Sequence, residues 1–314
     1  MEEELQPPKR KRRRRRFRLR GIVFLLLVAL IAVGVYAFIQ FKSGESLAGN
    51  SEQEPVTFDG DAANSDYENI LVLGVDSRGE EQSRTDTMML VTHDKVNNEI
   101  KLTSFMRDIY ADIPGFQSYK LNTAFYLGGV DLLADTLRGM FGVEIHHYAL
   151  IDFSSFESLV DVAAPNGVEI DVEKAMSKHI GVSLTPGVQD LNGKELLGYA
   201  RFRSDNEGDF GRVRRQQQVI AAMKDEMASV SAVANIPKLA GALQGYVQTD
   251  MPLTDQLKLA SQLAIGGSGE VERLTLPVEN SYSYGNYSHA GSVLDIDVEY
   301  NRLALSEYLS QPLD

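Results

Sequence analysis

The chain has 314 residues, of which 43% are hydrophobic, enough for one large domain or two small ones. It contains no cysteine, which excludes disulfides, thiolate catalysis and thiolate metal ligands. Residues 1–20 carry a net charge of +7 and the whole chain −13, so residues 21–314 carry −20. This imbalance indicates two segments in two environments, and the acidic part disfavours binding to nucleic acid.

The N-terminal region has the pattern of a membrane anchor. Residues 1–20 are rich in Lys and Arg, and residues 21–41 contain no charged side chain. An apolar stretch of this length spans a bilayer, and the positive flank before it places the N-terminus in the cytoplasm. We predict a cytoplasmic basic tail at 1–20, a transmembrane helix at 21–41 and a flexible extracytoplasmic linker at 42–66. A cleaved signal peptide is the alternative, and the apolar run is long for one.

From residue 67 onward, short apolar strands alternate with helical patterns. The strand-like segments are 69–75, 87–92, 100–105, 148–153, 168–172 and 271–276. The helical segments are 130–141, 154–162, 193–200, 211–227, 237–247, 254–265 and 298–309. Near-continuous apolar strands between helices are typical of an α/β sheet that is covered on both faces. We interpret 67–314 as a single domain.

Two aspartates stand at the ends of the first two predicted strands. Asp76 follows the first strand, and Asp86 opens the second. If the strands are neighbours, the two carboxylates converge at one edge of the sheet. They can then hold Mg²⁺, which shares oxygen ligands with phosphate groups. The alternative is that each aspartate is an ordinary turn or cap residue.

An arginine cluster at 201–215 stands out in an acidic domain, because it holds five arginines. On the predicted helix from Gly211 to about Met227, Arg212 and Gln216 fall within the apolar stripe, Arg215 lies on its flank and Arg214 points away. Cations in a first helical turn oppose the helix dipole, so the pattern indicates a bound anion, most simply a phosphate. The alternative is a structural cluster of salt bridges, with Asp209 as the helix cap.

Two further arginines, Arg84 and Arg107, stand beside predicted strand ends. Together with the cluster and the aspartates, they form the composition expected for phosphoryl transfer, which depends on positioning and charge neutralisation. The sequence has no P-loop, no Gly-x-Ser-x-Gly elbow and no His-Glu-x-x-His motif. A tyrosine-rich stretch near Tyr284 could stack on sugars, although an ordinary surface loop is the simpler interpretation.

The chain resembles the LytR–CpsA–Psr family of cell-wall proteins over about residues 69–224. The motifs that carry the resemblance are Leu73-Gly-Val-Asp-Ser-Arg78, Arg84-Thr-Asp-Thr-Met88, Ser104-Phe-Met-Arg-Asp108, Lys120-Leu-Asn-Thr-Ala-Phe125, Tyr199-Ala-Arg-Phe-Arg203 and Asp209-Phe-Gly-Arg-Val-Arg-Arg-Gln216. Together these motifs are highly specific. One departure is Met106, where many family members have proline, which would leave the loop that holds Arg107 less rigid.

The resemblance implies a three-layer α/β/α sandwich with a central mixed sheet and a hydrophobic pocket for a lipid tail. It implies an extracytoplasmic phosphotransferase anchored in the cell membrane. Such an enzyme moves a glycopolymer, for example teichoic acid or capsule, from a polyprenyl-pyrophosphate carrier to peptidoglycan through a phosphodiester bond. Its partners would be the lipid-linked glycopolymer, peptidoglycan and the membrane, but no nucleic acid.

The resemblance also assigns roles to residues of this sequence. It implies that Asp76 and Asp86 bind Mg²⁺ or Mn²⁺. The residues expected to act in catalysis are Arg84, Arg107, Arg203, Asp209 and Arg212. The residues expected to hold the pyrophosphate are Arg107, Arg201, Arg203, Arg212, Arg215 and Gln216, with Asp209 and Arg215 as supports. We expect Arg214 to be expendable.

Two other functions stay open at this point. A polyprenyl-phosphate-binding protein or a pyrophosphatase would use the same arginines, because water and a sugar hydroxyl attack the same phosphorus atom. A transcriptional regulator is the least favoured alternative. Its only DNA-like basic region adjoins the predicted membrane span, and the remaining chain is acidic.

Overall fold

The computed structural model describes residues 31–47, 57–76, 85–97, 99–227, 230–265 and 271–310. The predicted basic tail at 1–20 and the first ten residues of the predicted membrane span lie outside these ranges. Arg84, one of the predicted catalytic residues, also lies outside them.

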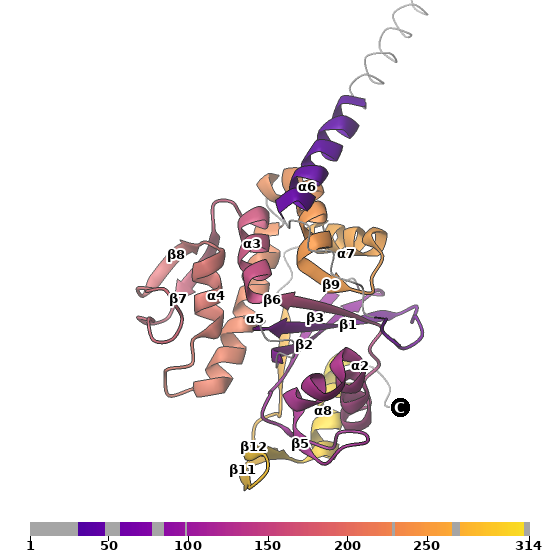
Figure 1. Cartoon of the computed structure of the whole chain (residues 1–314), viewed down its shortest axis with the longest axis vertical. Helices are drawn as coiled ribbons and strands as arrows, with labels where there is room; N and C mark the ends of the chain where they lie inside the picture. Colours follow the sequence, from indigo (N-terminus) through magenta and orange to yellow (C-terminus); the bar gives the residue numbers. More distant parts are fainter. Residues whose placement is uncertain are drawn as a thin grey trace, which may run out of the picture.

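A six-stranded mixed sheet forms the centre of the domain (Figure 1). Its strands are β1 (Tyr67–Val75), β2 (Thr85–Asp94), β3 (Glu99–Phe105), β6 (His147–Asp152), β9 (Val247–Thr249) and β10 (Glu272–Leu276), in the order β10-β3-β2-β1-β6-β9. The central strand β1 is antiparallel to β2 and parallel to β6. This confirms the prediction of an α/β fold with a mixed central sheet flanked by helices.

The two faces of the sheet are covered by different helices. Leu71 and Leu73 of β1 pack on one face in the main core, with α2 (Leu121–Phe141) and α8 (Val298–Leu309). Ile70 and Val72 point to the other face, as the two-residue period of a strand requires. The elements on that second face are α3 (Phe153–Ala163), α5 (Gly208–Met227), α6 (Val230–Tyr246) and α7 (Leu253–Ile265).

Smaller units surround this sandwich. The hairpin β7 (Val168–Val172) and β8 (Gly187–Leu191) packs with α3 and α4 (Gly193–Arg201) around a second core. The short pair β4 (Tyr110–Ala111) and β5 (Tyr119–Lys120) precedes α2. The stretch that we expected to be a surface loop instead forms the hairpin β11 (Tyr282–Tyr287) and β12 (Gly291–Ile296).

The chain before the domain is attached to it at two places. Residues 31–47 are helical and cross α6 at close range, where Gly44 and Gly241 allow the two backbones to approach. The Tyr246 hydroxyl donates to the Leu47 carbonyl at 2.6 Å. Further on, Phe58 packs edge-on against Tyr148, and Asp61 accepts a hydrogen bond from Arg138 at 2.7 Å. Residues 57–66 of the predicted linker therefore contact the domain.

The helix at residues 31–47 is apolar over its first half, where several large hydrophobic side chains are exposed. In the part of the chain that the structure describes, no helix is both long and apolar enough to cross a membrane.

We predict that Gly44→Leu separates the helix at 31–47 from α6. A Cβ atom at Gly44 would lie 1.9 Å from the Lys238 carbonyl oxygen, so the backbones must move apart. The matched control is Gly34→Leu on the same helix, because a Cβ atom there meets nothing within 4 Å. Since the chain has no cysteine, spin labels at Ser46→Cys and Ser177→Cys report the distance between helix and domain. A distance distribution in Gly44→Leu as narrow as in the control would contradict the docking.

Candidate functional site

A β-bulge brings the two predicted metal-binding aspartates to one edge of the sheet. Gly74 pairs with Thr87 and Val75 with Thr85, so Asp86 is the extra residue on β2, and Asp76 directly follows β1. The buried Thr85 hydroxyl lies between the carbonyls of Thr87 at 2.7 Å and Gly74 at 3.0 Å, and its one proton is shared between them across the bulge. The bulge thus turns the Asp86 carboxylate out of the normal alternation of the strand.

Arg107 follows β3 and reaches the same edge. Its Nη1 donates to Asp86 Oδ1 at 2.6 Å, and its Nε lies 3.3 Å from Asp209 Oδ2. Burial lowers the pKa of Arg107, but the charges of Asp209 and Asp86 raise it more, so the net shift is upward. Arg107 is therefore firmly cationic and connects β2 to the start of α5.

The loop around Arg107 is anchored despite the departure at Met106. Met106 is buried, and its backbone N–H donates to the Leu276 carbonyl at 2.9 Å, a bond that proline cannot make. On the other side, the Leu294 N–H donates to the Asp108 carbonyl at 2.8 Å. The Asp108 carboxylate accepts from Lys120 at 2.7 Å. These bonds compensate for the missing proline.

Arg212 lies in the interior of the cluster, at the start of α5. Only 4% of it is exposed, and its Nη2 donates to Asp209 at 2.9 Å and to the Asp86 carbonyl at 3.2 Å. Burial lowers its pKa, and the charge of Arg107 adds to that effect, while Asp209 opposes it. One turn later, Gln216 donates to the Thr87 hydroxyl at 2.9 Å. Helix α5 is thus fixed to β2 by polar contacts.

Arg201 and Arg203 complete the cluster at the end of α4. Arg201 Nη2 lies 3.7 Å from Asp76 Oδ2, and its guanidinium lies over the Phe153 ring at 4.5 Å. Arg203 is exposed, and its charge contributes to the lowered pKa of Arg212, so the two guanidiniums are neighbours. Among the described residues, Arg203 forms no ion pair. It is the arginine of the cluster that is available to a ligand.

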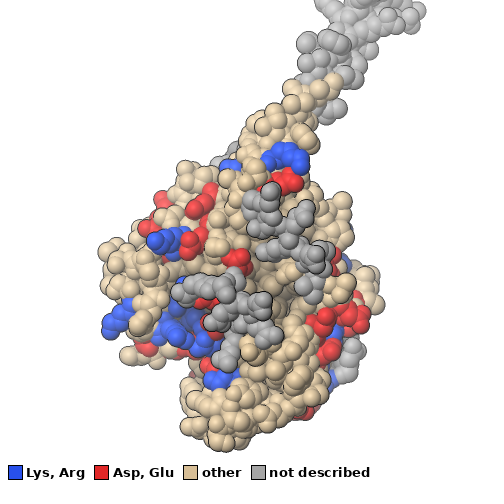
Figure 2. All heavy atoms as spheres, in the orientation of Figure 1, with Lys and Arg blue, Asp and Glu red and all other residues tan. Residues whose placement is uncertain are grey.

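The cluster has more donors than its carboxylates can satisfy. The Nε atoms of Arg107, Arg212 and Arg215 are buried and make no hydrogen bond within the described residues, although Arg107 Nε lies 3.3 Å from the Asp209 carboxylate. Figure 2 shows Lys and Arg side chains concentrated over α4 and α5, with Asp and Glu among them. Such an arrangement can bind an additional anion, because partly buried guanidiniums bind phosphate oxygens strongly.

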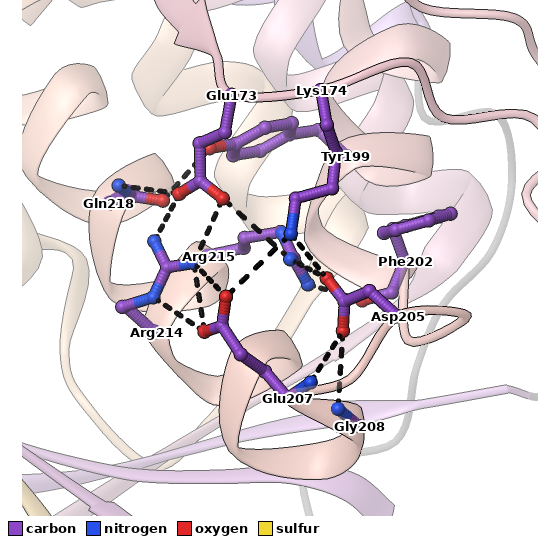
Figure 3. Close-up of polar contacts among 10 residues, drawn as sticks. All are labelled: Glu173, Lys174, Tyr199, Phe202, Asp205, Glu207, Gly208, Arg214, Arg215 and Gln218. Carbon is purple, nitrogen blue, oxygen red and sulfur yellow. Dashed lines mark hydrogen bonds and ion pairs between the residues drawn. The ribbon is translucent and has the colours of Figure 1, made fainter.

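Arg215 has a different position from its predicted partners. Its guanidinium is fully buried, donates to the Phe202 carbonyl at 2.9 Å and pairs with Asp205 (Figure 3). Asp205 in turn accepts from Lys174 at 3.1 Å and from the Gly208 backbone at 3.1 Å, which caps the start of α5. Arg215 therefore holds the loop between α4 and α5 that carries Arg203, and its side chain is enclosed by that loop.

Arg214 points to the other side of α5, as its place on the helix predicts. It pairs with Glu173 through both terminal nitrogens and with Glu207 (Figure 3). The hydrogen bond to Glu173 is the main reason that its pKa is raised. These contacts lie on the surface of the β7–β8 unit.

An apolar cavity of about 390 Å³ lies between the sheet and the helices of the second face. Its lining is almost entirely aliphatic and comes from β1, β2, β3, β6 and the four helices. Val219, Ile220 and Met223 of α5 form part of this lining, one to two turns after Gln216. The same helix therefore carries charged groups at its start and cavity-lining groups further along.

Three comparisons place the chain among known proteins. A model of the LytR_cpsA_psr family matches residues 33–304. The chain belongs to the LytR–CpsA–Psr family. It is 46% identical to "Regulatory protein MsrR" of Staphylococcus aureus, with 88% of this chain and 85% of that protein covered.

The chain is also similar to a named enzyme and to a protein of known crystal structure. The chain is 33% identical to "Polyisoprenyl-teichoic acid--peptidoglycan teichoic acid transferase TagU" of Bacillus cereus, with 75% of this chain and 78% of that protein covered. The crystal structure of B. subtilis TagV is 27% identical and has a TM-score of 0.67, covering 80% of this chain and all of TagV.

The structure thus brings together Asp76, Asp86, Arg107, Arg201, Arg203, Asp209, Arg212 and Gln216. Sequence reasoning did not assign roles to Thr85 and Thr87. Their hydroxyls hold the bulge and position Gln216, and the only available signal was that a threonine stands on each side of Asp86.

We predict that Arg215→Met lowers the free energy of unfolding by about 3 kcal/mol, because it leaves Asp205 buried without its main partner. Arg214→Met is the matched control, and its more exposed ion pair should cost less than about 1 kcal/mol. Urea unfolding of the two variants followed by circular dichroism measures both values. Equal losses would contradict the structural role of Arg215.

Proposed function

We propose that this protein is a phosphotransferase that moves a glycopolymer from a polyprenyl-pyrophosphate carrier to peptidoglycan. The observation that carries the proposal is the continuity between the arginine cluster and the apolar cavity along α5. In a ligand with a pyrophosphate joined to a long hydrocarbon chain, the pyrophosphate would match the arginine cluster and the hydrocarbon chain would match the apolar cavity. The name of the TagU relative, a polyisoprenyl-teichoic acid–peptidoglycan transferase, supports this class of substrate.

The residues of the cluster have distinct tasks in the proposed reaction. Arg107, Arg203 and Arg212 bind the pyrophosphate oxygens and stabilise the charge that develops on the leaving phosphate. The acceptor hydroxyl oxygen bonds to the phosphorus that carries the glycopolymer, and the bond from this phosphorus to the bridging oxygen breaks. Polyprenyl phosphate leaves, and the hydroxyl proton passes to an aspartate of the cluster.

Arg201 and Gln216 have positioning tasks. Arg201 holds Asp76 from the end of α4, and Gln216 fixes α5 to β2 through Thr87. The bulge in β2 places Asp86 at the same edge of the sheet as Asp76. A displaced reacting group costs orders of magnitude in rate, so these contacts matter for catalysis without touching phosphorus.

A divalent cation fits this edge of the sheet. Within the described ranges no group of three or more acidic or histidine side chains forms a complete metal site. The two carboxylates of Asp76 and Asp86 suit Mg²⁺ or Mn²⁺, which take their other ligands from water and phosphate oxygens. When bound, the ion would neutralise charge on the pyrophosphate.

The proposed location is the outer side of the cell membrane, with the N-terminus in the cytoplasm. The basic residues of the N-terminal tail and the uncharged stretch at 21–41 support this topology. Anchoring also keeps the enzyme and its lipid-linked donor in the same plane, which raises their effective concentration.

The main alternative is hydrolysis or simple binding of the lipid pyrophosphate by the same residues. The MsrR relative is named a regulatory protein. For this chain, direct regulation by binding DNA is disfavoured by the charge of −20 outside the basic tail.

The test of transfer uses the full chain in detergent with a lipid-pyrophosphate-linked glycan, a peptidoglycan oligomer and Mg²⁺. We expect a covalent glycan–peptidoglycan product together with free polyprenyl phosphate. Release of a free glycan phosphate without linkage would favour the hydrolase, and no turnover with tight donor binding would favour the binder.

We predict that Arg203→Lys lowers kcat/KM in this assay by about tenfold or more, because one ammonium cannot replace a planar two-oxygen fork. The matched control is Arg214→Lys, which makes the same change on the far side of α5 and should keep nearly full activity. Similar rates for both variants would contradict the assignment of Arg203 to the pyrophosphate oxygens.

We predict that Asp76→Asn weakens Mg²⁺ binding by about tenfold, since a carboxamide is a poorer ligand for a hard cation. Titration calorimetry with Mg²⁺ alone measures this without any turnover. Asp190→Asn, an exposed aspartate on β8, is the control and should leave the affinity unchanged. Unchanged affinity in Asp76→Asn would remove this residue from the metal site.

A further inference from the structure

The β11–β12 hairpin borders the arginine cluster directly. Its Leu294 N–H bonds to the carbonyl of Asp108, the residue after Arg107. Its Tyr282 ring stacks on Phe210 at 5.4 Å between ring centroids, and Phe210 follows Asp209 in the first turn of α5. The hairpin is therefore attached to both elements that carry the central ion pairs.

An aromatic surface extends from the site along this hairpin. Tyr282 and Tyr284 lie on the same face of β11, two residues apart, and their rings meet edge to face at 5.9 Å. Tyr284 is 74% exposed, so a ligand can reach the face of its ring. Phe210, Tyr282 and Tyr284 thus form a row of rings that begins beside Asp209.

A polar pocket of about 620 Å³ adjoins this row at the base of the hairpin. Its hydrogen-bonding groups include Glu279, Asn280 and Asp297, and Tyr282 is part of its wall. Asp295 also lines the pocket, but it pairs with Ser283 on the face of the hairpin opposite Tyr282 and Tyr284. Residues 279–300 contain four acidic residues and no Lys or Arg. The pocket therefore offers carboxylate and amide groups beside exposed aromatic rings.

The charge of this surface decides which substrate it fits. A glycopolymer donor rich in phosphate would be repelled by the carboxylates, and it would find its counter-charges on the arginines of α4 and α5. A glycan strand of amino sugars presents hydroxyl groups to carboxylates and apolar C–H faces to aromatic rings. Stacking on tyrosine faces and hydrogen bonds to acidic side chains together suit such a ligand.

The position of the hairpin agrees with this assignment. In Figure 1 the helix at residues 31–47 leaves the molecule on the side of α6, and the β11–β12 hairpin lies at the opposite end. A lipid-linked donor approaches from the membrane side. A strand of the cell wall approaches from the opposite side, where the hairpin lies.

We infer that the row of Phe210, Tyr282 and Tyr284, with the adjoining acidic pocket, binds the acceptor: a neutral amino-sugar glycan strand of peptidoglycan. This inference rests on the proposed function and assigns its acceptor subsite. Sugars along the row would place one hydroxyl at the arginine cluster, where the phosphorus lies.

The test measures glycan binding without the donor, so that its outcome does not depend on transfer. The probe is a soluble oligosaccharide of alternating N-acetylglucosamine and N-acetylmuramic acid whose lactyl carboxyl groups are amidated, so that it is uncharged, added to the full chain in detergent. The chain has no tryptophan, so tyrosine fluorescence reports binding directly, and calorimetry gives the affinity. We expect Tyr284→Ala to weaken binding by about tenfold, the effect of losing one stacking contact.

Two further variants make the result specific. Tyr284→Phe keeps the ring and should bind nearly as well as the parent chain. Phe116→Ala removes another exposed aromatic side chain, one that is absent from the pocket lining, and should have no effect. In the transfer assay, Tyr284→Ala should raise KM for the acceptor about tenfold at an unchanged KM for the donor.

The outcomes separate this inference from the proposed function. If the parent chain fails to bind the glycan, or Tyr284→Ala binds it as tightly, the acceptor subsite is overturned even when transfer occurs. If Tyr284→Ala instead raises KM for the donor, the surface serves the glycopolymer and the inference is also overturned. If glycan binding depends on Tyr284 but no transfer occurs, the subsite stands and the proposed reaction fails.

Discussion

The alternation of Asp86, Arg107, Asp209 and Arg212 is the interaction on which the site depends. The Arg107 guanidinium stands between the carboxylates of Asp86 and Asp209, and Arg212 pairs with Asp209 on its own helix and donates to the Asp86 carbonyl, so β2, the loop after β3 and the start of α5 are joined. Arg212 is almost fully buried, and a buried cation is tolerated only with such partners. The network keeps positive groups close together in an otherwise acidic domain before any substrate arrives.

This arrangement explains why a structural cluster and a binding site are not exclusive interpretations. Arg215 and Arg214 are structural in the ordinary sense, because their partners surround them completely or lie on the surface of another unit. Arg107 and Arg212 are also held by carboxylates, and, like Arg215, each has a buried Nε without a hydrogen-bond partner among the described residues. Arg203 has its charge beside Arg212 and its side chain exposed. The arginines of the cluster therefore range from fully buried and paired, as in Arg215, to exposed, as in Arg203.

Helix α5 links this charged network to the apolar cavity, which is the basis of the proposed amphiphilic substrate. Its first turns hold Asp209, Arg212 and Gln216, and its later turns supply Val219 and Met223 to the apolar cavity. The apolar stripe of this helix is unusual in the sequence because it contains Arg212 and Gln216. The structure explains this, since the start of the stripe contacts the charged network and its later part lines the cavity. The face that would seek a core in an ordinary helix is divided between a charged half and an aliphatic half.

Much of this could be predicted from the sequence, because strands and helices of this domain have strong periodic patterns. The convergence of Asp76 and Asp86 followed from strand ends, and the orientation of Arg214 followed from helix geometry. The role of Arg215 could not be predicted in this way, because the helical period places it only on the flank of the apolar stripe. Only the fold shows that Asp205 and the Phe202 carbonyl close over it. The β11–β12 hairpin was missed as well, since its Ser and Asn residues are typical of loops and its partner strand lies across a tight turn.

The position of the helix at 31–47 gives the site a direction. Gly44 and Gly241 let this helix cross α6 closely, and Leu239 and Leu243 of α6 line the apolar cavity. The helix at 31–47, which contains the end of the proposed membrane span, thus packs against the helix that supplies part of the cavity wall. A hydrocarbon chain would have to pass only from the bilayer to a helix that already adjoins it. The β11–β12 hairpin lies at the opposite end of the molecule (Figure 1), where the proposed acceptor strand would approach.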